Sequence, residues 1–460
     1  MPTNPPALTV AVQAQQDALR RELARGPASV SELATSLQVS QPTLSRTIQR
    51  ASNEVIRFRI TGQRTPLYAL TRALPGHVHP TQKMYRVDES GSITPTATLH
   101  FLAGGKTLLQ RGNGDQLYEG LTPAMAFAAP SGFLGRQVAH SAPAALQLPS
   151  SLKDWSDDHR IACLVAQSVN LPGDLVFGDA ALEREMKLRQ AKPVAESEKL
   201  KRYDAMALNF QEVGYGSSAG GEQPKFLCLT EQRGHVIVKF ARMRSRMAEL
   251  LALEHLALKV LAQAGVPAAA TALLHGAEHV YLEIERFDRR GRFGRLGLLS
   301  AGALDDEIFG RRDNWSAFAE RCESAGLLGA EDARRIHTMA AFSELIGNTD
   351  RHFENISLFV NDQGHPSGVT PAYDILPMKY APVGGGVDPD WLPVQPKLGP
   401  IGGRPDVWTV AYQAASEFWT QVTRRDIARS VSPALRKLAA QNLRVIRDFA
   451  QPLVTISVPD

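Results

Sequence analysis

The feature that most constrains the fold and function of this chain is a polar stretch between two apolar runs. The residues IGNTDRHFENISLF, from Ile346 to Phe359, hold an Asp, an Arg, a His, a Glu and two Asn between apolar neighbours. The preceding residues EDARRIHTMAAFSELI repeat apolar side chains at helical spacing, and Gly347 suits the C-terminal end of that helix. The run ISLFV predicts a strand. Two interpretations are open: a polar surface loop, or a catalytic loop held between two buried elements.

The spacing of two residues in this stretch favours the catalytic interpretation. Asp350 and Asn355 form a D-x-x-x-x-N pattern. In kinases this spacing lets the carboxylate meet the hydroxyl of the substrate while the amide oxygen binds a metal ion. Asp374, in AYDILP at the end of the next predicted strand, is placed as a second ligand for magnesium, which prefers oxygen donors. Taken singly, Asp350 could cap a turn, Asn355 could bind backbone, and Asp374 could lie in a surface turn.

A glycine-rich segment, YGSSAGGEQPK, runs from Tyr215 to Lys225 and precedes two predicted strands. Glycines let backbone N–H groups approach phosphate oxygens, so this segment is a candidate ATP-binding loop. The alternative is a hairpin turn that needs small residues. The candidate ATP-binding residues in it are Gly216, Ser217, Ser218, Gly220, Gly221 and Lys225.

Three further features follow in the order that a kinase requires. The strand HVIVKFAR carries Lys239, which can neutralise phosphates. The helix RMAELLALEHLALKVLAQAGV carries Glu249 and Glu254, and either could pair with Lys239. The strand VYLEIERFDR ends at Glu285 and Phe287, where a kinase joins its two lobes and its backbone meets adenine. This order, more than any one residue, predicts a phosphotransferase that uses ATP and Mg²⁺.

A zinc-dependent enzyme is one alternative that the residue pattern disfavours. His352 has no second histidine at the spacing of HExxH, which argues against a zinc site.

The N-terminal residues predict a DNA-binding domain. ALRRELARGPASVSELATSLQVSQPTLSRTIQRA reads as three short helices, and VIRFRITGQRTPLYALT as a β-hairpin, which together predict a winged helix-turn-helix. A generic three-helix packing module is the alternative. Residues 41–72 carry one acidic residue, Glu54, against the arginines Arg46, Arg50, Arg57, Arg59, Arg64 and Arg72. The candidate DNA-binding residues are Gln41, Thr43, Ser45, Arg46, Arg50 and Arg64.

Composition sets the outer limits. The chain has 460 residues, enough for two or three domains, and 51 Lys and Arg against 47 Asp and Glu give a net charge of +4. A basic surface must therefore be local. The three cysteines, Cys163, Cys228 and Cys322, form no C-x-x-C pair, which fits a reducing compartment. No signal peptide or membrane span is recognised, so we expect a cytoplasmic location.

Together these motifs resemble the HipA family of serine/threonine kinases, toxins of bacterial toxin–antitoxin systems. The resemblance lies in GSSAGGEQPK, VIVKF, ERFDR, LIGNTDRHFENISL and AYDILP, with GFLGR similar to the N-terminal subdomain of the family. It implies Asp350 as catalytic base, Asn355 and Asp374 as magnesium ligands, Lys239 as the phosphate-binding lysine and Glu285 to Phe287 as the adenine hinge. It also implies autophosphorylation of Ser218, or of Ser217 beside it, which would silence the kinase, and a substrate in the translation machinery.

The chain departs from the family at two points. Thr349 precedes Asp350 where many kinases have an arginine, so control through an arginine-paired activation-loop phosphate is not expected. The predicted DNA-binding segment precedes the kinase-like part in one chain. This arrangement resembles the single-chain, YjjJ-like form of the family and leaves open whether a separate antitoxin exists. Two other functions stay open: a DNA-binding regulator that senses nucleotide with little turnover, and a metal-dependent nuclease toxin.

The resulting prediction is an α+β chain with a winged helix-turn-helix followed by a two-lobed, protein-kinase-like HipA fold. Its expected parts are a DNA-binding domain (1–75), a linker (76–84), a HipA-like N-terminal subdomain (85–190), a kinase N-lobe (191–290) and a helical C-lobe with the catalytic loop (291–460).

Overall fold

The structure is a computed structural model that describes residues 7–112, 114–142, 144–212, 223–383, 386–424 and 429–454. The chain divides into two compact units. The first comprises residues 1–88, 92–131 and 135–190, and the second comprises residues 89–91, 132–134 and 191–460.

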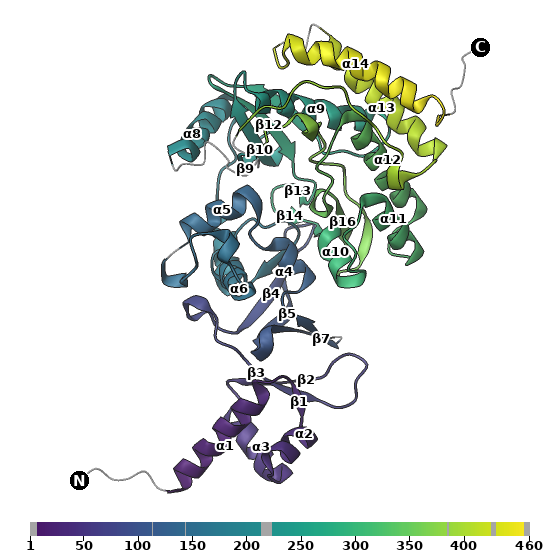
Figure 1. Ribbon diagram of the computed structural model, residues 1–460. Coiled ribbons are helices and arrows are strands. Elements are labelled where there is room, and N and C mark those ends of the chain that lie inside the picture. Colours follow the sequence, from purple (N-terminus) through teal and green to yellow (C-terminus); the bar gives the residue numbers. More distant parts are fainter. Residues whose placement is uncertain are drawn as a thin grey trace. The chain divides into compact units, whose positions relative to one another are not determined.

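The first unit begins with three helices and a small antiparallel sheet (Figure 1). These are α1 (Ala7–Leu23), β1 (Ala28–Ser29), α2 (Val30–Leu37), α3 (Gln41–Arg50), β2 (Val55–Phe58) and β3 (Leu67–Leu70), with the strands in the order β1-β3-β2. Ser29 starts α2 with a capping box, since its side chain accepts from the N–H of Glu32 while the Glu32 carboxylate accepts from the N–H of Ser29. Leu19, Leu33 and Leu44 form the buried core of this part.

The β2–β3 hairpin is bonded to the sheet that follows it within the same unit. Asp115 accepts hydrogen bonds from the backbone N–H of Arg59 through its side chain and of Thr61 through its carbonyl. Arg72 donates to the carbonyls of Leu102 and Lys106, each at 2.7 Å, and pairs with a carboxylate at 2.8 Å. Arg72 is thus a structural residue, although the sequence counted it with the basic surface.

The rest of the first unit is a five-stranded antiparallel sheet with short helices. The strands are β4 (Thr81–Val87), β5 (Ile93–Leu102), β6 (Lys106–Arg111), β7 (Gly114–Glu119) and β8 (Leu175–Phe177), in the order β7-β6-β5-β4-β8. The helices are α4 (Pro123–Ala128), α5 (Gly132–Ser141), α6 (Asp157–Ala166) and α7 (Asp179–Leu188). Buried apolar residues of β4, β5, α4 and α6 form its core. Since β4 begins at Thr81, the second half of the segment interpreted as a linker (76–84) belongs to this sheet.

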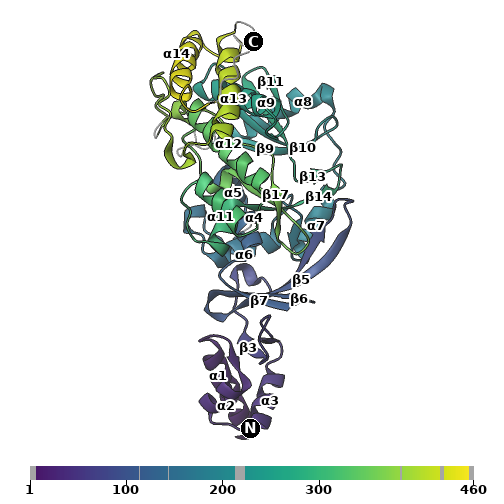
Figure 2. The same ribbon diagram turned by 90° about the vertical axis from the view of Figure 1, so that its right-hand side faces the viewer.

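The second unit opens with a four-stranded antiparallel sheet and two helices. The elements are α8 (Lys199–Glu212), β9 (Lys225–Thr230), β10 (Gly234–Arg242), α9 (Arg246–Gln263), β11 (Thr271–His275) and β12 (His279–Glu285), and the strand order is β11-β12-β10-β9. Both ribbon views show α9 beside this sheet (Figures 1 and 2). In the interior strand β10, Lys239 lies opposite Leu282 of β12 and Lys225 of β9.

The remainder of the second unit is mostly helical. Its helices are α10 (Ala301–Ile308), α11 (Trp315–Ser324), α12 (Ala330–Ile346), α13 (Pro405–Thr423) and α14 (Pro433–Ala450). Its strands are the pair β13 (Arg289–Arg290) and β14 (Gly294–Arg295), and the sheet of β15 (Gly297–Ser300), β16 (Ser357–Val360) and β17 (Pro366–Val369). α13 packs against both α12 and α14 (Figure 2). None of the described helices is long and apolar enough to cross a membrane.

A single large core joins α9 to these helices. It contains Leu250 and Leu253 of α9 together with buried residues of α10 to α14. Burial of these side chains holds α9 in place, and α9 carries a residue of the site described below.

We expect Leu253→Ala to lower the free energy of unfolding by about 2 to 5 kcal/mol, because it empties a fully buried position of this core. Urea denaturation of the whole chain, followed by tryptophan fluorescence, measures the loss. Leu208→Ala is the matched control, since Leu208 is 49% exposed on α8. Equal midpoints for the two variants would contradict the expectation.

Candidate active site

Lys239 is the centre of the site. Its ammonium group donates to both oxygens of Glu254, at 2.7 and 2.8 Å, and to Oδ1 of Asp374 at 2.6 Å. Lys239 and Glu254 are buried, whereas a third of the Asp374 side chain is exposed. Of the two glutamates that the sequence offered on α9, the structure selects Glu254. Glu249 instead accepts a hydrogen bond from the backbone N–H of Ser432.

The electrostatics of this cluster favour the charged lysine. Burial by itself would lower the pKa of Lys239, but Asp374 and Glu254 more than offset it and raise that pKa. Burial would raise the pKa of Asp374, but Lys239, with help from Lys225, lowers it to about 2. For Glu254, burial raises the pKa and Lys239 opposes the rise. The cluster therefore presents a fixed ammonium group and a partly exposed carboxylate side by side.

Asp374 follows a segment that is anchored at several points. Ala372 accepts a hydrogen bond from the N–H of Ala269 at 2.9 Å and donates to the carbonyl of Pro267 at 2.8 Å. The hydroxyl of Tyr373 donates to the carbonyl of Glu354 at 2.7 Å. Asp374 itself has a φ of +55°, in the left-handed region that few residues other than glycine adopt. Such a backbone persists at functional sites where the surroundings hold it.

The predicted catalytic loop is held by its backbone. Gly347 ends α12 with a φ of +80°, and Asn348 follows as a buried residue. The side-chain oxygen of Asn348 accepts a hydrogen bond from the backbone N–H of Asp350 at 3.0 Å. The backbone N–H of Asn348 donates to the carbonyl of Ser343 at 2.8 Å. Asn355 donates its amide to the carbonyl of Asp350 at 2.9 Å. The loop is thus closed on itself, with the Asp350 carboxylate about half exposed.

Asn355 and Asp374 are the residues that could hold a metal ion. The amide nitrogen of Asn355 is committed to the carbonyl of Asp350, so its oxygen is the donor that remains for a cation. Asp374 contributes a carboxylate that stays ionised. Two hard oxygen donors, completed by phosphate and water, suit Mg²⁺. The described residues contain no group of three or more His, Cys, Asp and Glu that could hold a metal ion.

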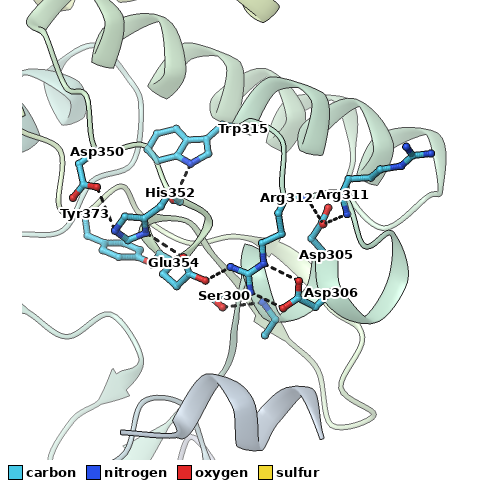
Figure 3. A network of polar contacts seen from close by, with 11 residues as sticks. Ser300, Asp305, Asp306, Arg311, Arg312, Trp315, Asp350, His352, Glu354 and Tyr373 are labelled. Carbon is cyan, nitrogen blue, oxygen red and sulfur yellow. Dashed lines mark hydrogen bonds and ion pairs between the residues drawn. The ribbon is translucent and has the colours of Figure 1, made fainter. Parts of the chain in front are cut away.

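Three further residues, which the sequence analysis gave no role in the chemistry, belong to the site. His352 lies between two carboxylates, with Nε2 3.7 Å from Oδ1 of Asp350 and Nδ1 3.2 Å from Oε2 of Glu354 (Figure 3). The other oxygen of Glu354 contacts Arg312. The D-x-H-x-E spacing of the loop was a signal for the first two, but no local pattern points to Arg312.

The predicted hinge lies beside a cavity. Glu285 pairs with Arg233 at 2.7 Å, and the ring of Phe287 packs on Tyr373 with ring centres 5.5 Å apart. The two hinge residues line a cavity of about 560 Å³. Five arginines share that lining, namely Arg233, Arg286, Arg289, Arg290 and Arg292.

The remaining candidate residues fall in two groups. Gly216, Ser217, Ser218, Gly220 and Gly221 lie outside the described residues, so their predicted roles stay predictions. Lys225 acts electrostatically on Asp374 and Glu254, which places its charge near the cluster. In the first unit Gln41, Ser45, Arg46, Arg50 and Arg64 are exposed, while Thr43 is half-buried. Glu54 is paired with Arg20 at 2.8 Å, so it does not neutralise these exposed arginines.

Comparisons with known proteins match both units. Residues 78–186 match the family described as YjjJ-like toxin, middle domain, and residues 217–438 match the HipA-like C-terminal domain. The chain is 30% identical over 442 residues to Toxin YjjJ of Escherichia coli strain K12, a match that covers 93% of this chain and 97% of that protein.

Among solved structures, the fold is similar to a chain in the complex of Shewanella oneidensis MR-1 HipA, HipB and operator DNA. That likeness has a TM-score of 0.50 and 14% identity, and covers 80% of this chain and 97% of the other. The Helicobacter pylori proinflammatory kinase CtkA has a lower TM-score of 0.37 at 12% identity, over 52% of this chain and 93% of its own. At these identities the HipA complex supports the fold alone.

We expect Glu254→Gln to lower the free energy of unfolding by about 2 to 4 kcal/mol, because it removes a charged partner from a buried ammonium group. Lys239 keeps its contact with Asp374 in this variant, so the loss of unfolding free energy is smaller than for a lysine without any partner. Urea denaturation is the measurement, and Lys259→Gln, an exposed charge on the same helix, is the control. A loss no larger than in the control would show that the pair is energetically neutral.

Proposed function

The chain belongs to the HipA-like toxin family, and on that premise we propose that it is an ATP- and Mg²⁺-dependent protein serine/threonine kinase. The observation that carries the proposal is the cluster of Lys239, Glu254 and Asp374, with Asp350 and Asn355 on a loop closed by their own hydrogen bond. These residue types perform phosphoryl transfer mainly by positioning and by electrostatic stabilisation.

Each residue has a distinct part in the proposed reaction. Lys239, oriented by Glu254, binds phosphate oxygens, and its contact with Asp374 loosens as the phosphates arrive. Asp350 accepts the proton that the serine or threonine hydroxyl of the substrate releases as that oxygen attacks phosphorus. Asn355 and Asp374 would hold the metal ion, which when bound neutralises charge on the phosphates. Glu285 and Phe287 would meet the adenine.

The proposed regulation and biological effect follow from the family. Ser218, or Ser217 beside it, would be autophosphorylated and so silence the kinase. The unphosphorylated chain would then inhibit growth by phosphorylating a protein in the cytoplasm, with the translation machinery as the proposed source of substrates. These statements rest on the family resemblance, since both serines lie outside the described residues.

We further propose that the first 75 residues act as a winged helix-turn-helix that binds DNA directly. The support is an α3 whose polar residues are largely exposed, a hairpin with Arg57, Arg59 and Arg64 exposed, and Glu54 neutralised by Arg20. The solved HipA relative is in complex with HipB and operator DNA. In this chain the fused segment would take over the contact with an operator, and a separate antitoxin would be dispensable for it.

A second candidate function is a regulator that senses nucleotide without turnover. The direct contact between Lys239 and Asp374 favours it, because nucleotide binding would have to exchange that ion pair for phosphate and metal contacts. It predicts that ATP changes DNA affinity while wild type and Asp350→Asn behave alike. A metal-dependent nuclease toxin would instead nick DNA with Mg²⁺ and without ATP.

We expect Asp350→Asn to reduce phosphate transfer by about 10²- to 10⁴-fold, because the amide cannot accept the hydroxyl proton. The purified chain is incubated with labelled ATP and Mg²⁺, and mass spectrometry locates the phosphate. Phosphoproteomes of cells that express each form are compared in parallel. Asp448→Asn, an exposed residue of α14, is the control. The kinase proposal is refuted if the wild-type protein labels neither itself nor any cellular protein more strongly than Asp350→Asn does.

Arg50→Ala is expected to weaken binding to a duplex from upstream of the coding sequence and to lower the salt slope of log K by about 1. The reason is that each arginine on a phosphate releases about one counterion. Fluorescence anisotropy at several salt concentrations measures both quantities. Arg25→Ala removes an arginine that is 77% exposed and precedes the proposed recognition helix, so it should change neither. Equal slopes for all three proteins would argue against DNA contact by α3.

A further inference from the structure

A chain of ion pairs runs from α10 to the carboxylate of Asp350. We propose that Arg312 and Glu354 are positioning residues, which hold His352 beside Asp350 so that its carboxylate faces the hydroxyl of the substrate. This inference deepens the proposed kinase function and rests on it. The four residues are called the clamp below, and Figure 3 shows them together with the residues that support them.

The inner end of the clamp is the imidazole of His352. Its Nδ1 is 3.2 Å from Glu354, and its Nε2 is 3.7 Å from Asp350, a charge contact beyond hydrogen-bonding distance. The hydrogen bond to Glu354 raises the pKa of His352, burial opposes this, and the charges of Asp350, Glu354 and Asp374 add to the rise. The ring orientation is therefore set from the side of Glu354, and the imidazole lies next to the Asp350 carboxylate.

The outer end of the clamp is a bidentate ion pair. Arg312 donates from Nε and Nη2 to the two oxygens of Asp306, at 2.7 and 2.6 Å, and from Nη1 to Glu354. A guanidinium group bound through three nitrogens has little rotational freedom, so it holds the Glu354 carboxylate in one place. The hydrogen bond from His352 and the contact with Arg312 outweigh burial and hold the pKa of Glu354 at about 2.

The backbone of Arg312 is itself fixed by a buried carboxylate. Oδ2 of Asp305 accepts from the N–H of Arg311 at 2.7 Å and of Arg312 at 2.8 Å, while Oδ1 pairs with Arg321 at 2.7 Å. Asp305 is fully buried, and Arg312 has a φ of +43°, in the left-handed region. A buried charge with three donors supports this turn, and the turn points Arg312 at the catalytic loop (Figure 3).

Gly302 leaves the space that the clamp occupies. A Cβ atom at this position would lie 2.5 Å from Oε1 of Glu354 and 2.8 Å from Nη1 of Arg312. Since real Cβ atoms do not approach other atoms so closely, an alanine here, in the first turn of α10, would displace the ends of the Arg312 and Glu354 side chains from their present contact. The backbone of the loop is anchored separately, because Trp315 donates to the carbonyl of His352 and Tyr373 to that of Glu354.

The exposure of the clamp residues indicates that their contacts contribute little to the stability of the fold. The side chains of Arg312, Glu354, His352 and Asp350 are 41 to 50% exposed. Ion pairs at such exposure contribute little to folding, since water screens them and their side chains lose freedom. A buried Asp305, a left-handed backbone at Arg312 and the space left by Gly302 nonetheless favour this one arrangement. Its effect is therefore expected in the orientation of Asp350, where small displacements reduce rate strongly.

Arg312→Gln and Glu354→Gln in the full chain test the clamp. We expect each to lower kcat for autophosphorylation about 10- to 100-fold with an at most twofold change in KM for ATP, because the clamp orients Asp350 and not the nucleotide. Binding of a fluorescent ATP analogue should be unchanged. Arg312→Lys should restore part of the rate, and Gly302→Ala should imitate Arg312→Gln. The control is Arg334→Gln, whose partner Glu331 lies at 2.8 Å with similar exposure on α12.

The possible results separate the clamp from the kinase proposal. If the wild type is active and Arg312→Gln transfers phosphate as fast as Arg334→Gln, the clamp proposal is overturned and the kinase proposal stands. Parallel loss of ATP-analogue binding, or an unfolding midpoint well below that of the control, also overturns it, because the role would then be structural. If labelling by the wild type does not depend on Asp350, the proposed function and the clamp proposal are both overturned.

Discussion

The buried ion pair between Lys239 and Glu254 is the interaction on which the rest of the second unit is organised. It joins the interior strand β10 to α9, and α9 is held by the large apolar core. Removing two charges from water is costly, so such a pair is weak support for stability by itself. Its value lies in fixing the ammonium group where a second carboxylate, Asp374, can approach to 2.6 Å. A strand, a helix and a loop from distant parts of the sequence are thereby brought to one point.

The proposed catalytic loop carries exposed charge and must nonetheless be kept in one conformation. Asn348 and Asn355 do this from within, by bonding the backbone on both sides of Asp350. The clamp acts from outside, through Glu354 and Arg312, and determines what lies next to the carboxylate. Backbone position and side-chain orientation are thus controlled by separate contacts. This separation explains why the loop can be ordered while the Asp350 carboxylate stays open to solvent.

Much of the site could be predicted from the sequence because its motifs occur in a fixed order. Lys239 could be assigned, but the choice between Glu249 and Glu254 could not, since both lie on one helix and only packing shows which is buried. The sequence does not link Arg312 to the loop, because Arg312 is 42 residues from its partner Glu354 in the chain. Contacts of this kind depend on tertiary packing, which leaves no local pattern. The glycine-rich loop remains a prediction.

The first unit shows how a local charge excess can arise in a nearly neutral protein. Of the basic residues near the hairpin, Arg72 donates to carbonyl oxygens and pairs with a carboxylate, and Arg20 neutralises Glu54. The exposed arginines of α3 and the hairpin are left as a surplus. Asp115 meanwhile bonds the hairpin backbone to the five-stranded sheet, so the hairpin is not a free flap. Under the proposal that this segment binds DNA, a hairpin fixed in this way would lower the entropy lost on binding the polyanion.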